Sequence, residues 1–162
     1  MGSGKTLCSK AIGQELNLEV YDTDRIIESN EGLTIPDIFT KYGEKYFRNC
    51  ESQVIQYFSK KDNIVVATGG GLPCHNNNMD KLNEMGTTIY LKSTVEELVY
   101  RLEKSHQRRP LIQGKNHDEL IEFVTENLEK RDEFYSKADI VYHVQGRDIS
   151  QLVAFLKYTH KN

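Results

Sequence analysis

The chain has 162 residues, 28% of them charged, and a formal net charge of −3, a size typical of one domain that can bury a core without disulfides or structural metals. Acidic and basic residues are mixed along the sequence, which argues against a protein that coats nucleic acid or an anionic membrane. The three cysteines are widely spaced and the five histidines show no metal-ligand spacing, so neither a disulfide framework nor a histidine-held metal is expected, and a reducing cytosol is the expected location.

The first six residues, Met1-Gly2-Ser3-Gly4-Lys5-Thr6, match the second half of a P-loop. In that motif the backbone N–H groups of a glycine-rich turn and of the following helix surround phosphate oxygens. Gly2 and Gly4 suit the tight turn, Lys5 can reach the β and γ phosphates, and the Thr6 hydroxyl can hold magnesium. Taken alone, so short a motif is also compatible with an ordinary turn.

The next segments predict a helix over residues 5–16 and a short strand over 18–22. Asp22 and Asp24 follow at the carboxyl end of this strand, where ligands bind in open α/β sheets. Asp22 can also simply end the strand or cap a turn.

A cap at Thr34 predicts a helix that Gly43 ends. A longer helix over 44–59 carries Arg48 and Glu51 as an i,i+3 pair, which is either a surface salt bridge or an orienting contact.

An apolar, β-branched strand is predicted over 63–67, and Gly69-Gly70-Gly71 follows it. Three glycines in succession exceed what a turn requires, so we expect a backbone that approaches a ligand closely, with a structural turn as the alternative.

The rest of the chain continues the alternation of strands and helices, which predicts a parallel sheet with helices on both faces. We expect strands over 87–91 and 140–144, a helix opened by a Ser93–Glu96 capping box, a basic loop over 105–116 that is a lid or a surface excursion, a long helix capped by Asp118, and a last helix capped by Asp148.

Six segments together resemble the shikimate kinase family over essentially the whole chain. They are Met-Gly-Ser-Gly-Lys-Thr at 1–6, Asp-Thr-Asp at 22–24, Phe-Arg-x-x-Glu at 47–51, Gly-Gly-Gly at 69–71, Arg-Pro-Leu at 109–111 and Arg-x-x-x-Tyr at 131–135. The resemblance implies an ATP- and magnesium-dependent kinase that phosphorylates the 3-hydroxyl of shikimate in aromatic amino-acid biosynthesis. It also implies the P-loop kinase fold of the nucleoside monophosphate kinase type, as a single domain over 1–162 with a substrate-binding region at about 24–60 and a lid at about 105–117.

The resemblance assigns roles on the phosphate side of the site. Gly2, Ser3, Gly4 and Lys5 would bind the ATP phosphates, Thr6 and Asp22 would hold magnesium, and Arg109 would be the lid arginine that closes on the phosphates. Arg101 and Arg147 lie near positions where the family contacts adenine.

On the acceptor side, the resemblance places Asp24 against the acceptor hydroxyl, as base or as orienting group. Arg48 and Arg131 are the candidates for binding the shikimate carboxylate, because a guanidinium group can donate two parallel hydrogen bonds to a carboxylate. Glu51 would fix the Arg48 rotamer, and Gly69, Gly70 and Gly71 would offer N–H groups to the substrate.

Two alternatives stay open: another small kinase of this fold, for gluconate or a nucleoside monophosphate, and a nucleotide-binding regulator without turnover. The expected partners are ATP and shikimate, with no nucleic acid or membrane, and we expect a monomer.

The strand that leads into a P-loop is central in a doubly wound sheet, and this sequence lacks it. We therefore expect the natural protein to carry roughly ten more residues before Met1, with a β-branched apolar strand that ends in Gly-x.

Overall fold

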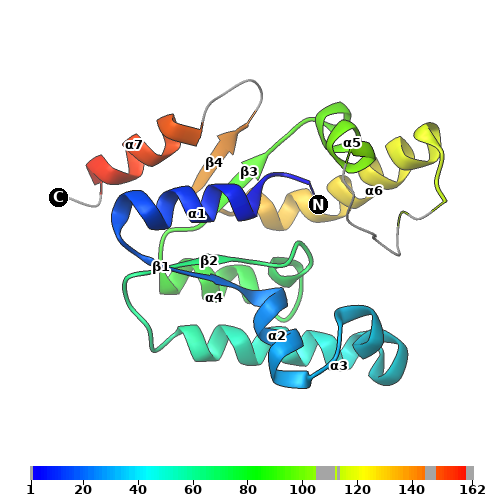
Figure 1. Cartoon of the computed structure of the whole chain (residues 1–162), viewed down its shortest axis with the longest axis horizontal. Coiled ribbons are helices and arrows are strands. Elements are labelled where there is room, and N and C mark those ends of the chain that lie inside the picture. Colours follow the sequence, from blue (N-terminus) through cyan, green and yellow to red (C-terminus); the bar gives the residue numbers. More distant parts are fainter. Residues whose placement is uncertain (1, 105–111, 113, 145–148, 160–162) are drawn as a thin grey trace.

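The computed structural model of the chain describes residues 2–104, 112, 114–144 and 149–159. Helices and strands alternate along it (Figure 1). In chain order they are α1 (Lys5–Leu16), β1 (Glu19–Asp22), α2 (Thr23–Glu31), α3 (Ile35–Phe58), β2 (Ile64–Ala67), the 3₁₀ turn η1 (Leu72–Cys74), α4 (Asn78–Met85), β3 (Ile89–Lys92), α5 (Val95–Lys104), α6 (His117–Tyr135), β4 (Ile140–His143) and α7 (Ile149–Thr159).

The strands form two parallel pairs. β1 pairs with β2, with Glu19 opposite Ile64, and β3 pairs with β4, with Ile89 opposite Ile140. Among the described residues no strand joins β2 to β3, so the pairs are separate two-stranded sheets. The predicted α/β class with parallel strands is confirmed.

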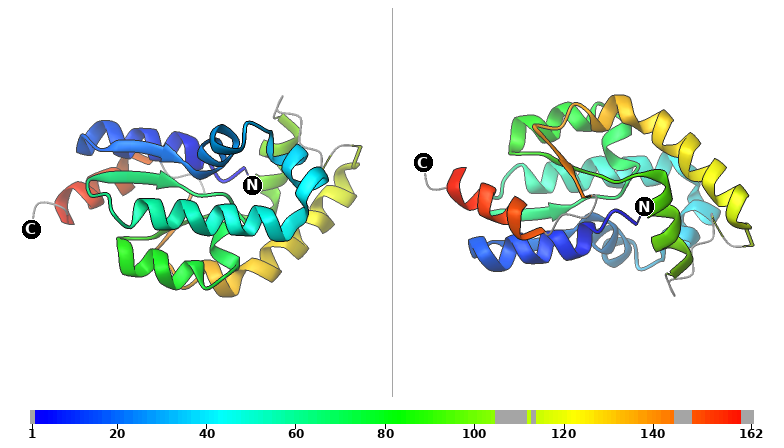
Figure 2. Two further views of the ribbon diagram at one scale, coloured as in Figure 1. Left: turned by 90° about the horizontal axis from the view of Figure 1, so that it is seen from below. Right: turned by 90° about the horizontal axis from the view of Figure 1, so that it is seen from above.

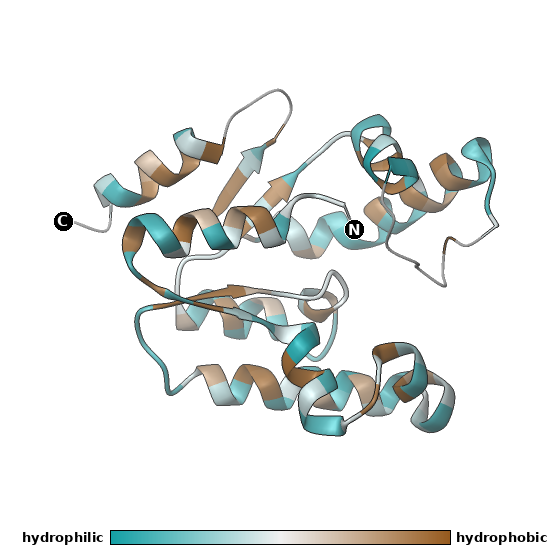
Figure 3. Ribbon diagram, in the orientation of Figure 1, coloured by the Kyte–Doolittle hydropathy of each residue, from teal (hydrophilic) through white to brown (hydrophobic). Residues whose placement is uncertain are grey.

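Helices cover both faces of the first strand pair, because its side chains alternate between two apolar clusters. Ile64 and Val66 pack with the buried residues of α2 and α3. Val65 points the other way and packs with the cluster of α1 and α7, which also takes in Ile89 and Leu91 of β3. Figure 2 shows β1 and β2 between α1 and α3, and Figure 3 shows the apolar residues gathered on the strands and on the inner sides of these helices.

Gly43 breaks the α3 segment, as predicted. Its φ of 78° and ψ of 173° kink the chain between two helical stretches, a conformation that favours glycine. The Thr34 cap is also confirmed, since its hydroxyl accepts a hydrogen bond from the N–H of Asp37 at 3.3 Å. Helix α4 was not predicted.

Two predicted helix caps are wrong. At the start of α5 the hydroxyl of Thr94, not that of Ser93, accepts the N–H of the third helical residue, Glu97, at 3.3 Å. At the start of α6 a capping box joins Asn116 and Glu119. That pair satisfies two N–H groups reciprocally, which a cap at Asp118 would not. The third predicted cap, Asp148, lies outside the described residues.

No helix within the described ranges is both long and apolar enough to cross a lipid bilayer.

Candidate active site

The glycine-rich loop and the start of α1 form the phosphate side of the site. Gly2 and Gly4 have φ values of 69° and 89°, in the left-handed region that favours glycine. Gly4 precedes α1 and provides no side-chain cap, and the N-terminus of a helix is a position that favours anions. Arg101 of α5 donates to the Gly2 carbonyl at 3.3 Å, so it lies against this loop.

Asp22 is the last residue of β1, and Asp24 lies in the first turn of α2. One oxygen of Asp22, Oδ1, accepts the N–H groups of Asp24 at 3.0 Å and Arg25 at 3.3 Å and so caps α2. Burial is the largest cause that raises the pKa of Asp24; Asp22 raises it further, while Lys5 and Arg48 lower it. The charge of Asp24 is therefore influenced by two cations, one from the phosphate loop and one from α3.

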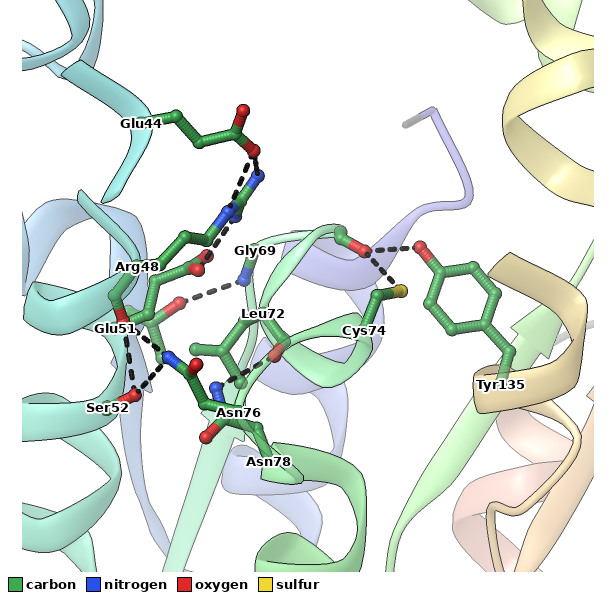
Figure 4. Close-up of polar contacts among 12 residues, drawn as sticks. Glu44, Arg48, Glu51, Ser52, Gly69, Leu72, Cys74, Asn76, Asn78 and Tyr135 are labelled. Atoms are coloured by element: carbon green, nitrogen blue, oxygen red, sulfur yellow. Dashed lines mark hydrogen bonds and ion pairs between the residues drawn. The ribbon is translucent and has the colours of Figure 1, made fainter. Parts of the chain in front are cut away.

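Arg48 is held by two carboxylates of its own helix (Figure 4). Its Nη1 lies 2.7 Å from Oε2 of Glu51, whose side chain is only 1% exposed. Its Nη2 and Nε lie 3.0 and 3.2 Å from Oε1 of Glu44, which is 60% exposed. The Arg48–Glu51 pair is therefore buried at one end, which argues against a plain surface salt bridge.

The glycine loop is fixed from two sides. The N–H of Gly69 donates to the Thr23 hydroxyl at 2.9 Å, and the Tyr135 hydroxyl donates to the Gly70 carbonyl. Among the described residues, the N–H groups of Gly70 and Gly71 have no hydrogen-bond acceptor, so they are available to a ligand.

Each of the three glycines faces a different site side chain. A Cβ would lie 2.6 Å from Oδ1 of Asp24 at Gly69, 3.2 Å from Nη1 of Arg131 at Gly70, and 2.7 Å from Nη1 of Arg48 at Gly71. The run of glycines is thus explained by close approach of charged groups, which a simple turn would not need.

Gly71→Ala therefore displaces the Arg48 guanidinium. We expect the KM for a carboxylate substrate to rise about tenfold or more, since a charge-assisted hydrogen bond contributes about 1.5–3 kcal/mol, while ATP binding is unchanged. Steady-state kinetics with each substrate varied measures both. The matched control is Gly86→Ala, because a Cβ at Gly86 meets nothing within 4 Å; a normal KM in Gly71→Ala would contradict the assignment.

The predicted residues come together from distant parts of the chain. The electrostatic contacts of Asp24 link it to Lys5 and Arg48, and the glycine loop touches Asp24, Arg48 and Arg131. Arg109, Arg147 and most of the predicted lid lie outside the described residues.

Three contacts were missed from the sequence: Glu44 on Arg48, Thr23 on Gly69, and Tyr135 on Gly70. The i,i+4 spacing of Glu44 and Arg48 was the signal that could have revealed the first.

The donor set suits magnesium better than a transition metal. No group of three or more His, Cys, Asp or Glu side chains within the described ranges could hold a metal ion. Magnesium keeps most of its waters and binds through one or two protein oxygens and substrate phosphates. Thr6 lies in the first turn of α1 and Asp22 has a second carboxylate oxygen free of its capping role, so the two predicted ligands fit this chemistry.

Comparison with known proteins identifies the family of this chain. The family model described as "Shikimate kinase" matches residues 1–158. A shikimate kinase from Azobacteroides pseudotrichonymphae is 42% identical over 154 residues, covering 94% of this chain and 91% of the relative.

Solved structures are similar over the same length. The crystal structure of shikimate kinase from Bacteroides thetaiotaomicron has a TM-score of 0.92 at 36% identity and covers 100% of this chain and 94% of its own. Shikimate kinase from Acinetobacter baumannii in complex with shikimate has a TM-score of 0.83 at 31% identity and covers 96% of this chain and 86% of its own. This chain belongs to the shikimate kinase family.

Proposed function

We propose that this chain transfers the γ-phosphoryl group of ATP to the 3-hydroxyl of shikimate, the molecule in complex with the related shikimate kinase from Acinetobacter baumannii. The observation that carries the proposal is the convergence of Arg48, Arg131 and Asp24 on the glycine loop. Two arginines suit a carboxylate, and an aspartate suits a hydroxyl that must lose a proton.

On the phosphate side, Gly2, Ser3, Gly4 and Lys5 would bind the β and γ phosphates, and Lys5 would offset the charge of the transferred group. Magnesium, held by Thr6 and Asp22, would neutralise phosphate charge when bound. Arg101 would contribute to nucleotide binding, since its side chain already contacts the carbonyl of Gly2 in the phosphate loop.

On the acceptor side, Arg48 and Arg131 would hold the carboxylate, and the N–H groups of Gly70 and Gly71 would bind substrate oxygens. Asp24 would accept the proton of the hydroxyl or orient it. Its raised pKa suits a carboxylate that takes a proton, because burial weakens its preference for the charged form.

Arg109 and Arg147 would complete the nucleotide side. Arg109 would close on the phosphates as part of a lid and exclude water, which suppresses ATP hydrolysis. We further propose that the protein works as a monomer in the cytosol.

The experiment that tests the function is incubation with ATP and magnesium against a panel of shikimate, gluconate and nucleoside monophosphates, with detection of the phosphorylated product. Transfer to shikimate supports the proposal. Transfer to gluconate or a nucleotide would point to the rival small kinases, and nucleotide binding without transfer to any acceptor would point to a regulator.

Arg131→Ala tests the acid-binding role. Loss of one charge-assisted contact is worth about 1.5–3 kcal/mol, so kcat/KM for shikimate should fall about 10- to 150-fold. ATP affinity should stay nearly intact, as calorimetric titration would measure. The neighbouring exposed cation offers the control variant Lys130→Ala, and an equal loss of ATP affinity in Arg131→Ala would remove Arg131 from the acid site.

A further inference from the structure

Glu44 occupies the part of Arg48 that a substrate carboxylate would use. Its Oε1 accepts hydrogen bonds from both Nε and Nη2 of Arg48, at 3.2 and 3.0 Å (Figure 4). Nη1 is bonded to Glu51 at 2.7 Å. All three guanidinium nitrogens are therefore engaged by protein carboxylates, and two negative charges already surround one positive charge.

An anionic substrate that reaches Arg48 competes with these two carboxylates for the same guanidinium group. One carboxylate has to yield, and burial decides which. Glu51 is 1% exposed, so losing its partner would leave a buried charge uncompensated. Glu44 is 60% exposed, and exposed ion pairs are weak and exchange readily with water.

The backbone next to Glu44 suits such a release. Gly43 has φ 78° and ψ 173° at the kink of α3, and Glu44 is the first residue of the helical stretch that follows. A carboxylate near a helix N-terminus is stabilised by the helix dipole and by water, so Glu44 keeps a favourable environment after it leaves Arg48.

We propose that Glu44 is a competing carboxylate that sets the affinity of the acid substrate: it occupies Arg48 in the free protein, and the substrate carboxylate displaces it. This inference rests on the proposed function of Arg48 as a carboxylate-binding residue. The apparent affinity is then the intrinsic affinity multiplied by the fraction of Arg48 that is free of Glu44. Because the phosphorylated product keeps the same carboxylate, Glu44 also favours its release.

Glu44→Gln tests this, because it removes the charge and keeps the size of the side chain. We expect the KM for shikimate to fall about threefold to fivefold, the upper part of the range of an exposed ion pair, with KM for ATP unchanged. Product inhibition by shikimate 3-phosphate should strengthen by a similar factor. The methyl ester of shikimate, which lacks the charge, should bind both proteins equally when measured as an inhibitor.

The matched control is Glu126→Gln, which breaks an exposed i,i+4 pair with Lys130 on α6 (3.1 Å) and should leave every parameter as in the wild type. Glu44→Ala should act in the same direction as Glu44→Gln. An unchanged or raised KM for shikimate in both variants would overturn the proposal, and a raised KM would make Glu44 a residue that orients Arg48. If the wild-type protein transfers phosphate to no shikimate at all, the proposed function fails instead, so the two failures are distinguishable.

Discussion

Asp24→Asn should lower kcat about 100-fold or more and leave ATP affinity nearly unchanged. General acid–base groups contribute about 10²–10⁴-fold to rate, and the asparagine amide cannot accept the proton of the acceptor hydroxyl. Nucleotide contacts come from the loop at Gly2 to Lys5, which the substitution leaves in place. Steady-state kinetics together with calorimetric titration of ATP measures both quantities.

The pH profile gives the same variant a second readout. Burial, and next the charge of Asp22, raise the pKa of Asp24 above its ordinary value, so activity in the wild type should fall on the acid side as this carboxylate becomes protonated. Asp24→Asn should lose that acid limb. Asp80→Asn, at an exposed carboxylate of α4, is the control, and a near-normal kcat in Asp24→Asn would move Asp24 out of the catalytic set.

The sequence predicted the fold where periodicity and glycine chemistry are strong. The apolar run at Ile64–Ala67 and the break at Gly43 follow from local preferences and are confirmed. Caps were harder, because neighbouring polar residues such as Ser93 and Thr94 compete for the same N–H groups and only three-dimensional geometry decides. Helix α4 was missed because its few apolar residues give little periodicity.

The site was predictable as a set of residues but not as a set of contacts. Gly69 and Asp24 are far apart in the sequence. Nothing in the sequence shows that a Cβ at Gly69 would lie 2.6 Å from the carboxylate of Asp24. The Glu44–Arg48 spacing was visible, yet its meaning depends on Glu51 being buried and on where a substrate would bind. Competition between a protein carboxylate and a ligand for the same arginine is visible only once the site is assembled in three dimensions.

Arg48→Ala should destabilise the protein as well as weaken acid binding. Glu51 is 1% exposed and Arg48 is its ion-pair partner at 2.7 Å. Breaking a buried pair from one side leaves a buried charge, which typically lowers the free energy of unfolding by about 3–5 kcal/mol. We expect this loss at neutral pH, measured by urea denaturation of the variant and the wild type.

The loss should shrink at acid pH. Burial raises the pKa of Glu51 above the ordinary 4.5, and the hydrogen bond and charge of Arg48 lower it, so Arg48→Ala raises this pKa further. A carboxyl with a higher pKa in the folded protein than in the unfolded chain binds its proton more tightly when folded. Its stabilising effect is therefore complete below the unfolded pKa and is lost as pH rises through the folded pKa.

The double variant Arg48→Ala/Glu51→Gln separates the two roles of the arginine. Replacing the unpaired carboxylate of Glu51 by a neutral amide should recover much of the stability at neutral pH, because the buried charge is gone. Acid-substrate affinity should stay low in the double variant, since the guanidinium that binds the carboxylate is still missing. Recovery of stability without recovery of substrate binding would show that the destabilisation comes from the unpaired Glu51 carboxylate and the loss of binding from the missing guanidinium. A single variant Arg48→Ala as stable as the wild type at neutral pH would show that Glu51 does not depend on Arg48.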